Sequence, residues 1–134
     1  MHTVGERSLE KYFLKTGNTT WGVQNLEYDS YSRRFMLAVY RGKKECYPNY
    51  NMFFVSSDCE VRRSLHSAYG EQIAELSLSG EGSYFPYGST GMCALGDGRY
   101  YFSEDGRDAE QGCYTNVSLY RKGEDNATPF LKNE

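Results

Sequence analysis

The side chains of this chain with the clearest catalytic potential are carboxylates near the ends of apolar segments. They are Glu27, Asp29, Glu104, Asp105 and Asp108. Two carboxyl groups held about 5 to 9.5 Å apart can hydrolyse a glycosidic bond. However, an Asp in a turn most often accepts hydrogen bonds from its own backbone, so Asp29 and the corresponding Asp97 are expected to be structural. A hydrolase acting on carbohydrate or ester is therefore the alternative function rather than the preferred one.

Nucleophilic and metal chemistry have less support. His2 lies near the first residue, and His66 has no Ser or Cys motif beside it, whereas nucleophilic catalysis needs a base close to the nucleophile. The cysteines are Cys46, Cys59, Cys93 and Cys113. They form no C-x-x-C pair or His-rich cluster, and their redox state stays open. We expect no catalytic motif, no metal and no cofactor.

The elements that must position the polar residues are strands, and they repeat along the chain. Equivalent positions at nearly constant offsets are Gly22 and Gly91, Gly42 and Gly106, and Cys46 and Cys113. A strand-turn-strand unit cannot bury its apolar faces alone, so it stacks on copies of itself. The 13 Tyr and 7 Phe also suit half-buried strands. The sequence predicts an all-β fold of antiparallel strand repeats in two blade-like sheets, either partly propeller-like or stacked.

The expected organisation is a single domain over 1–134 made of two repeats, about 10–62 and 72–121. Expected strands cover 10–16, 21–28, 35–40, 51–56, 91–95, 99–103 and 114–121, and a loop covers 104–112. Ile73, Leu76 and Leu78 indicate a further strand. A short helix competes near 59–69, because Val61, Leu65 and Ala68 fall at helical spacing. The tail 123–134 is polar and is expected to fray, apart from Phe130 and Leu131.

Two strings carry a resemblance to known architecture. Residues 16–29 (TGNTTWGVQNLEYD) and 39–44 (VYRGKK) resemble an uncharacterised propeller-like family, and the turn-separated strands resemble β-propeller blades. The resemblance spans roughly 10–121, lacks the WD40 and kelch signatures, and implies no activity or catalytic residues. A closed ring needs at least about four blades of ~40 to 50 residues. Two repeats therefore imply self-association or the remainder of a larger propeller.

Equivalent loops of neighbouring blades would lie at the same level, and loops on a rigid scaffold commonly carry binding residues. The expected ligand-binding residues are Arg41, Lys43, Asn51, Asp105, Arg107 and Asn116. With tyrosines nearby, such a surface suits a polar ligand such as a glycan or a peptide. The sequence therefore predicts a non-catalytic binding or assembly module.

Charge and hydropathy exclude other classes of partner. A net charge of −3, from 15 basic and 18 acidic residues, provides no general attraction for nucleic acid or an anionic membrane. No apolar run approaches the ~20 residues of a membrane helix. The first residues lack the apolar core of a secretory signal, so the compartment stays open.

Overall fold

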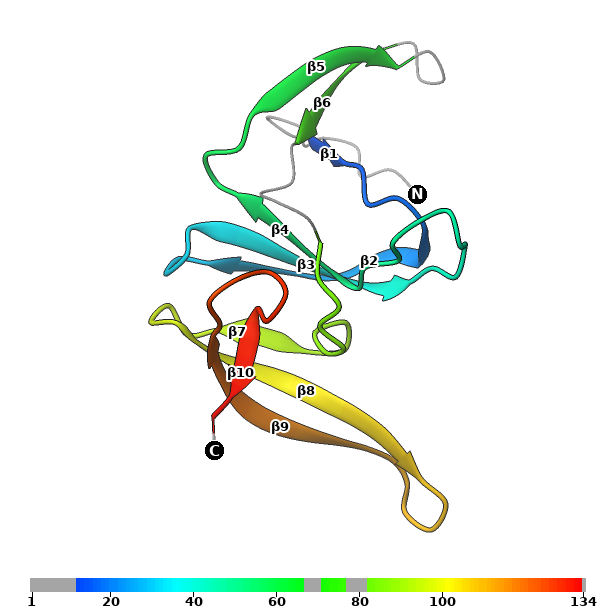
Figure 1. Ribbon diagram of the computed structural model, residues 1–134, viewed down its shortest axis with the longest axis vertical. Coiled ribbons are helices and arrows are strands. Elements are labelled where there is room, and N and C mark those ends of the chain that lie inside the picture. Colours follow the sequence, from blue (N-terminus) through cyan, green and yellow to red (C-terminus); the bar gives the residue numbers. More distant parts are fainter. Residues whose placement is uncertain (1–11, 67–70, 77–81, 134) are drawn as a thin grey trace, which may run out of the picture.

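The apolar run 35–40 forms the middle of a three-stranded sheet. A computed structural model describes residues 12–66, 71–76 and 82–133, and these residues form strands and no helix. The central sheet is antiparallel in the order β2-β3-β4, with β2 at Thr19–Asp29, β3 at Arg34–Arg41 and β4 at Met52–Ser56 (Figure 1). Since alternate residues of a strand face opposite sides, Met36 and Ala38 share one face of β3 and Phe35 and Leu37 the other.

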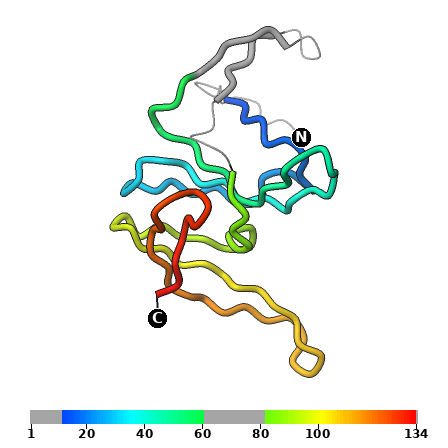
Figure 2. Tube along the Cα trace, viewed as in Figure 1, coloured from blue at the N-terminus to red at the C-terminus, as the bar shows by residue number. Residues whose placement is uncertain are grey.

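A second antiparallel sheet follows in the chain. Its order is β10-β9-β8-β7, with β7 at Met92–Ala94, β8 at Arg99–Asp108, β9 at Gly112–Lys122 and β10 at Phe130–Lys132. In Figure 2 this sheet is the part of the trace coloured from yellow-green to red. Gly96 and Gly98 adopt left-handed φ values of 83° and 87° at the turn between β7 and β8. The all-β, antiparallel prediction is confirmed.

The third sheet contains two expected strands, those over 10–16 and around Ile73 and Leu76, but their assembly into a separate sheet was not predicted; Leu78 lies outside the described residues. Its order is β1-β6-β5, with β1 at Tyr12–Leu14, β5 at Val61–His66 and β6 at Glu71–Leu76. The β5 and β6 strands pair antiparallel, whereas β1 pairs with β6 in parallel. The helix expected near 59–69 is therefore wrong over Val61–His66. Pairing with β6 satisfies the backbone N–H and carbonyl groups of this segment. The helical spacing of three apolar residues does not outweigh these strand hydrogen bonds.

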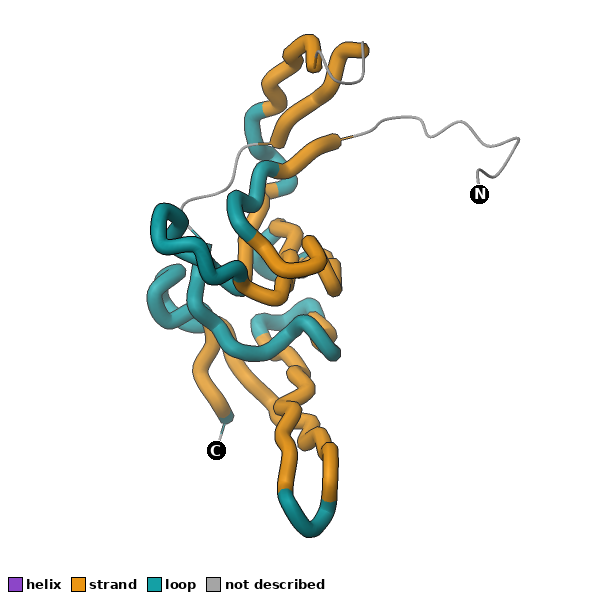
Figure 3. The backbone as a smooth tube through the Cα atoms, turned by 90° about the vertical axis from the view of Figure 1, so that its right-hand side faces the viewer, coloured by secondary structure: helices purple, strands orange, loops and turns teal. Residues whose placement is uncertain are grey.

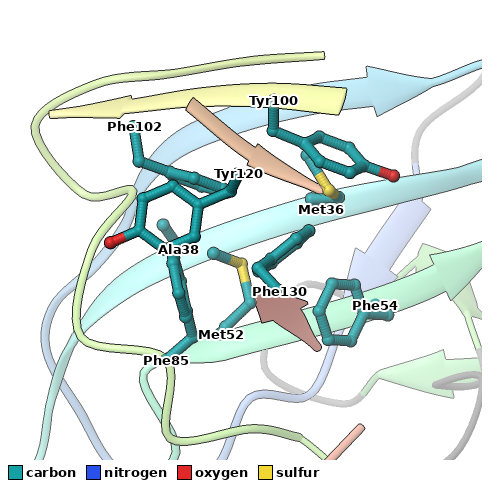
Figure 4. Packing of buried hydrophobic residues seen from close by; sticks show 9 residues of the cluster. All are labelled: Met36, Ala38, Met52, Phe54, Phe85, Tyr100, Phe102, Tyr120 and Phe130. Carbon is teal, nitrogen blue, oxygen red and sulfur yellow. The ribbon is translucent and has the colours of Figure 1, made fainter. Parts of the chain in front are cut away.

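The main core lies between the central sheet and the four-stranded sheet. Its buried members are Met36, Ala38, Met52, Phe54, Phe85, Tyr100, Phe102, Tyr120 and Phe130 (Figure 4). Phe85 comes from the connection between the sheets, and its ring centroid lies 4.6 Å from that of Phe102 and 4.8 Å from that of Phe130. Phe130 and Leu131, the two exceptions in the tail, form part of β10, and the burial of Phe130 holds the tail on the sheet.

One buried polar contact joins the same two sheets. The Asp29 side chain at the end of β2 is fully buried, and the Tyr100 hydroxyl of β8 donates a hydrogen bond to its Oδ2. Ser32 also donates to Oδ2, and the Tyr31 backbone N–H donates to Oδ1 at 3.1 Å. Burial, followed by the hydrogen bond to Asp29, raises the pKa of Tyr100 well above its ordinary value. The turn role predicted for Asp29 is confirmed, and a second role appears as the link between sheets.

The four-stranded sheet extends into a two-stranded arm. The loop expected over 104–112 is wrong, because β8 continues to Asp108 and β9 begins at Gly112. The turn is tight: Asp108 Oδ1 accepts hydrogen bonds from the N–H groups of Glu110 and Gln111, and Gly112 has a φ of 79°. The arm projects away from the other strands (Figure 3).

We expect Tyr100→Phe to lower the free energy of unfolding by about 1 to 3 kcal/mol, because it removes from a buried carboxylate the donor that comes from the facing sheet and leaves only those of its own turn. Tyr101→Phe is the matched control, since the Tyr101 side chain is exposed on the opposite face of β8; its effect should stay within about 0.5 kcal/mol. Urea unfolding followed by circular dichroism measures both. Equal effects of the two substitutions would contradict the role assigned to the buried hydrogen bond.

Candidate functional site: a hollow beside Trp21

An irregular pairing of β2 with β3 creates the site. Thr20 pairs with Tyr40 and Val23 pairs with Val39, so Trp21 and Gly22 have no opposite residues on β3. Both adopt left-handed backbone conformations, with φ values of 66° and 73°. The Gln24 side-chain amide donates to the carbonyls of Trp21 and Gly22 at 2.9 and 3.3 Å. These contacts hold the bulge in place.

Trp21 is the exposed residue of this bulge. Its side chain is 84% exposed, the highest value among the exposed large hydrophobic residues. A left-handed φ is uncommon for residues other than glycine, and bulky residues there are outliers. A large apolar ring on a strained backbone contributes little to packing in this position. Strained positions of this kind cluster at binding sites.

Trp21 borders an open hollow of about 610 Å³, which we call the Trp21 hollow. Its lining is Thr20, Trp21, Val39, Tyr40, Arg41, Lys43, Asn51, Pro86, Ser89 and Asp105. These residues come from β2, β3, the loop between β3 and β4, the connection between the sheets and β8. The hollow therefore depends on the packing of the two antiparallel sheets against each other.

Backbone contacts fix the polar rim of the hollow. Asn18 Oδ1 accepts hydrogen bonds from the N–H groups of Lys43 and Lys44 at 3.1 and 3.2 Å, and the Asn18 carbonyl accepts from Gly42 N–H. Thr20 Oγ1 donates to the Arg41 carbonyl at 3.2 Å. These hydrogen bonds fix the backbone of the turn that carries the Arg41 and Lys43 side chains.

Two side chains of β2 attach the bulged strand to the rest of the molecule. Asn25 Nδ2 donates to the Gly88 carbonyl at 3.0 Å, and Glu27 Oε1 accepts from the Ala94 N–H of β7 at 3.3 Å. Gly88 has a φ of 113°, and a Cβ at this position would come within 2.9 Å of Met52 and 3.2 Å of Ala38. The segment containing Pro86 and Ser89 is therefore fixed beside Trp21.

The structure brings four of the six sequence-predicted binding residues to one place. Arg41, Lys43, Asn51 and Asp105 all line the Trp21 hollow. Arg107 lies further out on the arm, opposite Cys113. Asn116 pairs with Glu104, and the alternation of a strand places it on the face of the arm opposite that of Asp105. The structure thus separates Asn116 from the hollow.

Most of the remaining carboxylates already have structural partners. Glu104 accepts a hydrogen bond from the Tyr120 hydroxyl at 2.9 Å and pairs with Lys132 at 3.0 Å. Hydrogen bonds from Ser118 and then from Lys132 lower the pKa of Glu104. Asp97 binds the Arg99 side chain at 2.6 Å and its backbone N–H, as predicted for a turn residue. These contacts leave Asp105 as the carboxylate that lines the hollow.

Cation sites find no support in the described part of the chain. No group of three or more His, Cys, Asp or Glu side chains lies together among the described residues. All four cysteines are free thiols, with Cys46, Cys93 and Cys113 exposed. Within the same residues there is no helix with the length and apolar character of a membrane-spanning segment.

Comparisons with protein-family models, with curated proteins and with solved structures gave no significant match to this chain. Its residues and their geometry are therefore the basis for assigning a function.

Sequence reasoning missed Trp21 as a site residue. The available signal was the single Trp of the chain followed by Gly at the start of a strand, because Gly in a strand often marks a bulge. Tyr40, Pro86 and Ser89 were also missed, because their place at the hollow depends on how the sheets pack.

We expect Trp21→Asn to leave the free energy of unfolding unchanged within about 0.5 kcal/mol or to raise it, because the ring is exposed and Asn accepts a left-handed φ better than Trp. Gly22→Ala is the comparison. A Cβ at Gly22 meets no atom within 4 Å, so it tests backbone strain without a steric clash, and we expect a loss of about 1 kcal/mol. Thermal and urea unfolding measure both, and a clear loss of stability in Trp21→Asn would show that Trp21 is structural.

Proposed function

We propose that this chain is a non-catalytic binding module that holds a glycan in the Trp21 hollow. The observation that carries the proposal is an 84% exposed Trp on a strained backbone beside Arg41, Lys43, Asn51 and Asp105. Binding sites combine apolar rings with a few placed polar groups. The hollow has this composition.

The chemistry of a sugar matches these groups. One face of a pyranose ring consists of C–H bonds, which can pack on the flat face of an indole. Its hydroxyl groups both donate and accept hydrogen bonds. Arg41 and Lys43 supply donors, Asp105 supplies acceptors, and the Asn51 amide is capable of both. Tyr40, also half-exposed, adds a second ring at the same rim.

A peptide is the other candidate ligand from the sequence, and the open hollow of about 610 Å³ has space for a short one. The exposed indole of Trp21 favours a sugar, because it offers a flat platform rather than a pocket for a side chain. The hydrolase alternative has no observation in its favour, since Glu27, Asp29 and Glu104 each have separate structural partners.

The blade-like interpretation remains part of this proposal. The strands β2-β3-β4 of the first predicted repeat share one antiparallel sheet, and β7-β8-β9 of the second share another, whereas β1 and β6 pair in the third sheet. The face-to-face packing of these sheets supports a stack of blade-like units. Membership of a propeller-like family and completion of a larger propeller stay predictions.

A glycan array probed with the labelled protein tests the function, followed by calorimetry on any oligosaccharide retained. We expect Trp21→Asn to weaken that affinity at least about 30-fold, the effect of removing a central binding residue. Asp105→Asn should weaken it less, because its amide oxygen still accepts a hydrogen bond.

Tyr101→Ala is the control, as an exposed aromatic residue outside the hollow, and its affinity should stay within twofold of the parent protein. An array without any retained glycan, alongside peptides that bind and depend on Trp21, would replace the glycan with a peptide. Binding that is unaffected by Trp21→Asn would place the ligand elsewhere.

A further inference from the structure

The arm formed by β8 and β9 has two free edges. On one side, β7 covers β8 only as far as Phe102, with one further backbone hydrogen bond from Ser103 N–H to the Gly91 carbonyl. On the other side, β10 pairs with β9 over Tyr120–Lys122, and Asn133 N–H donates to the Leu119 carbonyl. Beyond these points the described arm is two-stranded. Isolated two-stranded hairpins are marginally stable in water.

The two edges differ in charge. The β8 edge carries Glu104, Asp105, Arg107 and Asp108. By contrast, the β9 segment from Gly112 to Leu119 contains no charged residue, and Val117 on it is 65% exposed. Natural proteins protect free edges with charges, bulges, prolines or short strands. The β8 edge has the charges, β2 has the bulge and β7 is short. None of these protections is present on this part of β9.

The ladder defines which groups of β9 point outward. Leu119 directs its carbonyl towards β10. Since the direction of backbone groups alternates along a strand, Val117, Thr115 and Cys113 direct their N–H and carbonyl groups to the same free edge. Three outward-facing residues in a row can form a continuous antiparallel ladder with another strand.

We propose that two copies of this chain associate through antiparallel pairing of β9 with β9 about a two-fold axis at Thr115. This register places Thr115 opposite Thr115 of the partner subunit, and Val117 opposite Cys113 of the partner subunit. Tyr114 then lies opposite Asn116 of the partner subunit. Every pair is uncharged and repeats symmetrically, as an isologous interface requires. A cross-strand Thr pair adds to the stability of such a ladder.

The proposal does not depend on the ligand of the Trp21 hollow. It gives Asn116, predicted as a binding residue, a place in the interface instead. It also explains why the arm can persist as strands so far from the core, because pairing converts two marginal hairpins into one four-stranded sheet.

Sedimentation velocity over a wide concentration range, in reducing buffer, tests the association. The parent protein and the neutral variant Val117→Thr should form a reversible dimer. Val117→Lys should remain monomeric at the highest concentration, because an edge Lys opposes strand pairing. Circular dichroism of Val117→Lys should be unchanged, since the side chain already faces solvent.

A charge pair then tests the register. Cys113→Glu combined with Val117→Lys places opposite charges across the interface twice and should restore the dimer. Cys113→Lys combined with Val117→Lys places like charges there and should stay monomeric. Hydrogen exchange should show slow amides at Cys113, Thr115 and Val117 in the dimer and fast ones in Val117→Lys. A monomeric parent protein, a dimer that survives Val117→Lys, or a Glu/Lys variant that stays monomeric would each overturn the proposal.

Discussion

The hydrogen bond from the Tyr100 hydroxyl to the buried Asp29 carboxylate determines how the two antiparallel sheets face each other. A buried carboxylate is costly unless it has hydrogen-bond donors. Ser32 and the Tyr31 N–H donate from the same turn, and the Tyr100 hydroxyl is the donor that comes from the facing sheet, so it links the end of β2 to β8. Aromatic contacts alone would tolerate small shifts, because rings such as Phe85, Phe102 and Phe130 pack in several tilted arrangements. The polar contact therefore favours one relative position of the two sheets, and the aromatic core provides the apolar surface that they bury.

That arrangement also places the candidate site. With Tyr100 fixed against Asp29, the continuation of β8 carries Asp105 to the hollow formed by the bulge of β2 and the turn after β3. Trp21 then lies in a bulge whose backbone is strained and held by hydrogen bonds, and its exposed ring does not pack in the core. The aromatic residues therefore fall into two groups: the buried ones stabilise the packing of the sheets, whereas the exposed Trp21 has a role other than stability. A site built on strands is also more precise than one built on loops.

Local patterns in the sequence were sufficient for the strands of the two antiparallel sheets, because turns such as Gly96-Asp97-Gly98 and the run 35–40 are unambiguous. Strands were expected at β1 and β6, but their assembly into a third sheet was missed, since the parallel pairing of β1 with β6 joins segments distant in sequence. Four binding residues converge as the repeat indicates, but Arg107 and Asn116 do not. Most of the predicted loop over 104–112 is paired strand, which carries Arg107 further out on the arm, and alternation turns Asn116 away. The bulge at Trp21 depends on register, which local patterns do not contain.

The most direct test uses the only Trp of the chain as its own probe. Because Trp21 is almost fully exposed, its emission in the free protein should be that of an indole in water and should be quenched readily by iodide. Titration with the oligosaccharides retained on an array is predicted to shift this emission to shorter wavelength and to protect it from iodide, in a saturable manner. Saturable binding that leaves both the emission and the quenching of Trp21 unchanged would contradict the account.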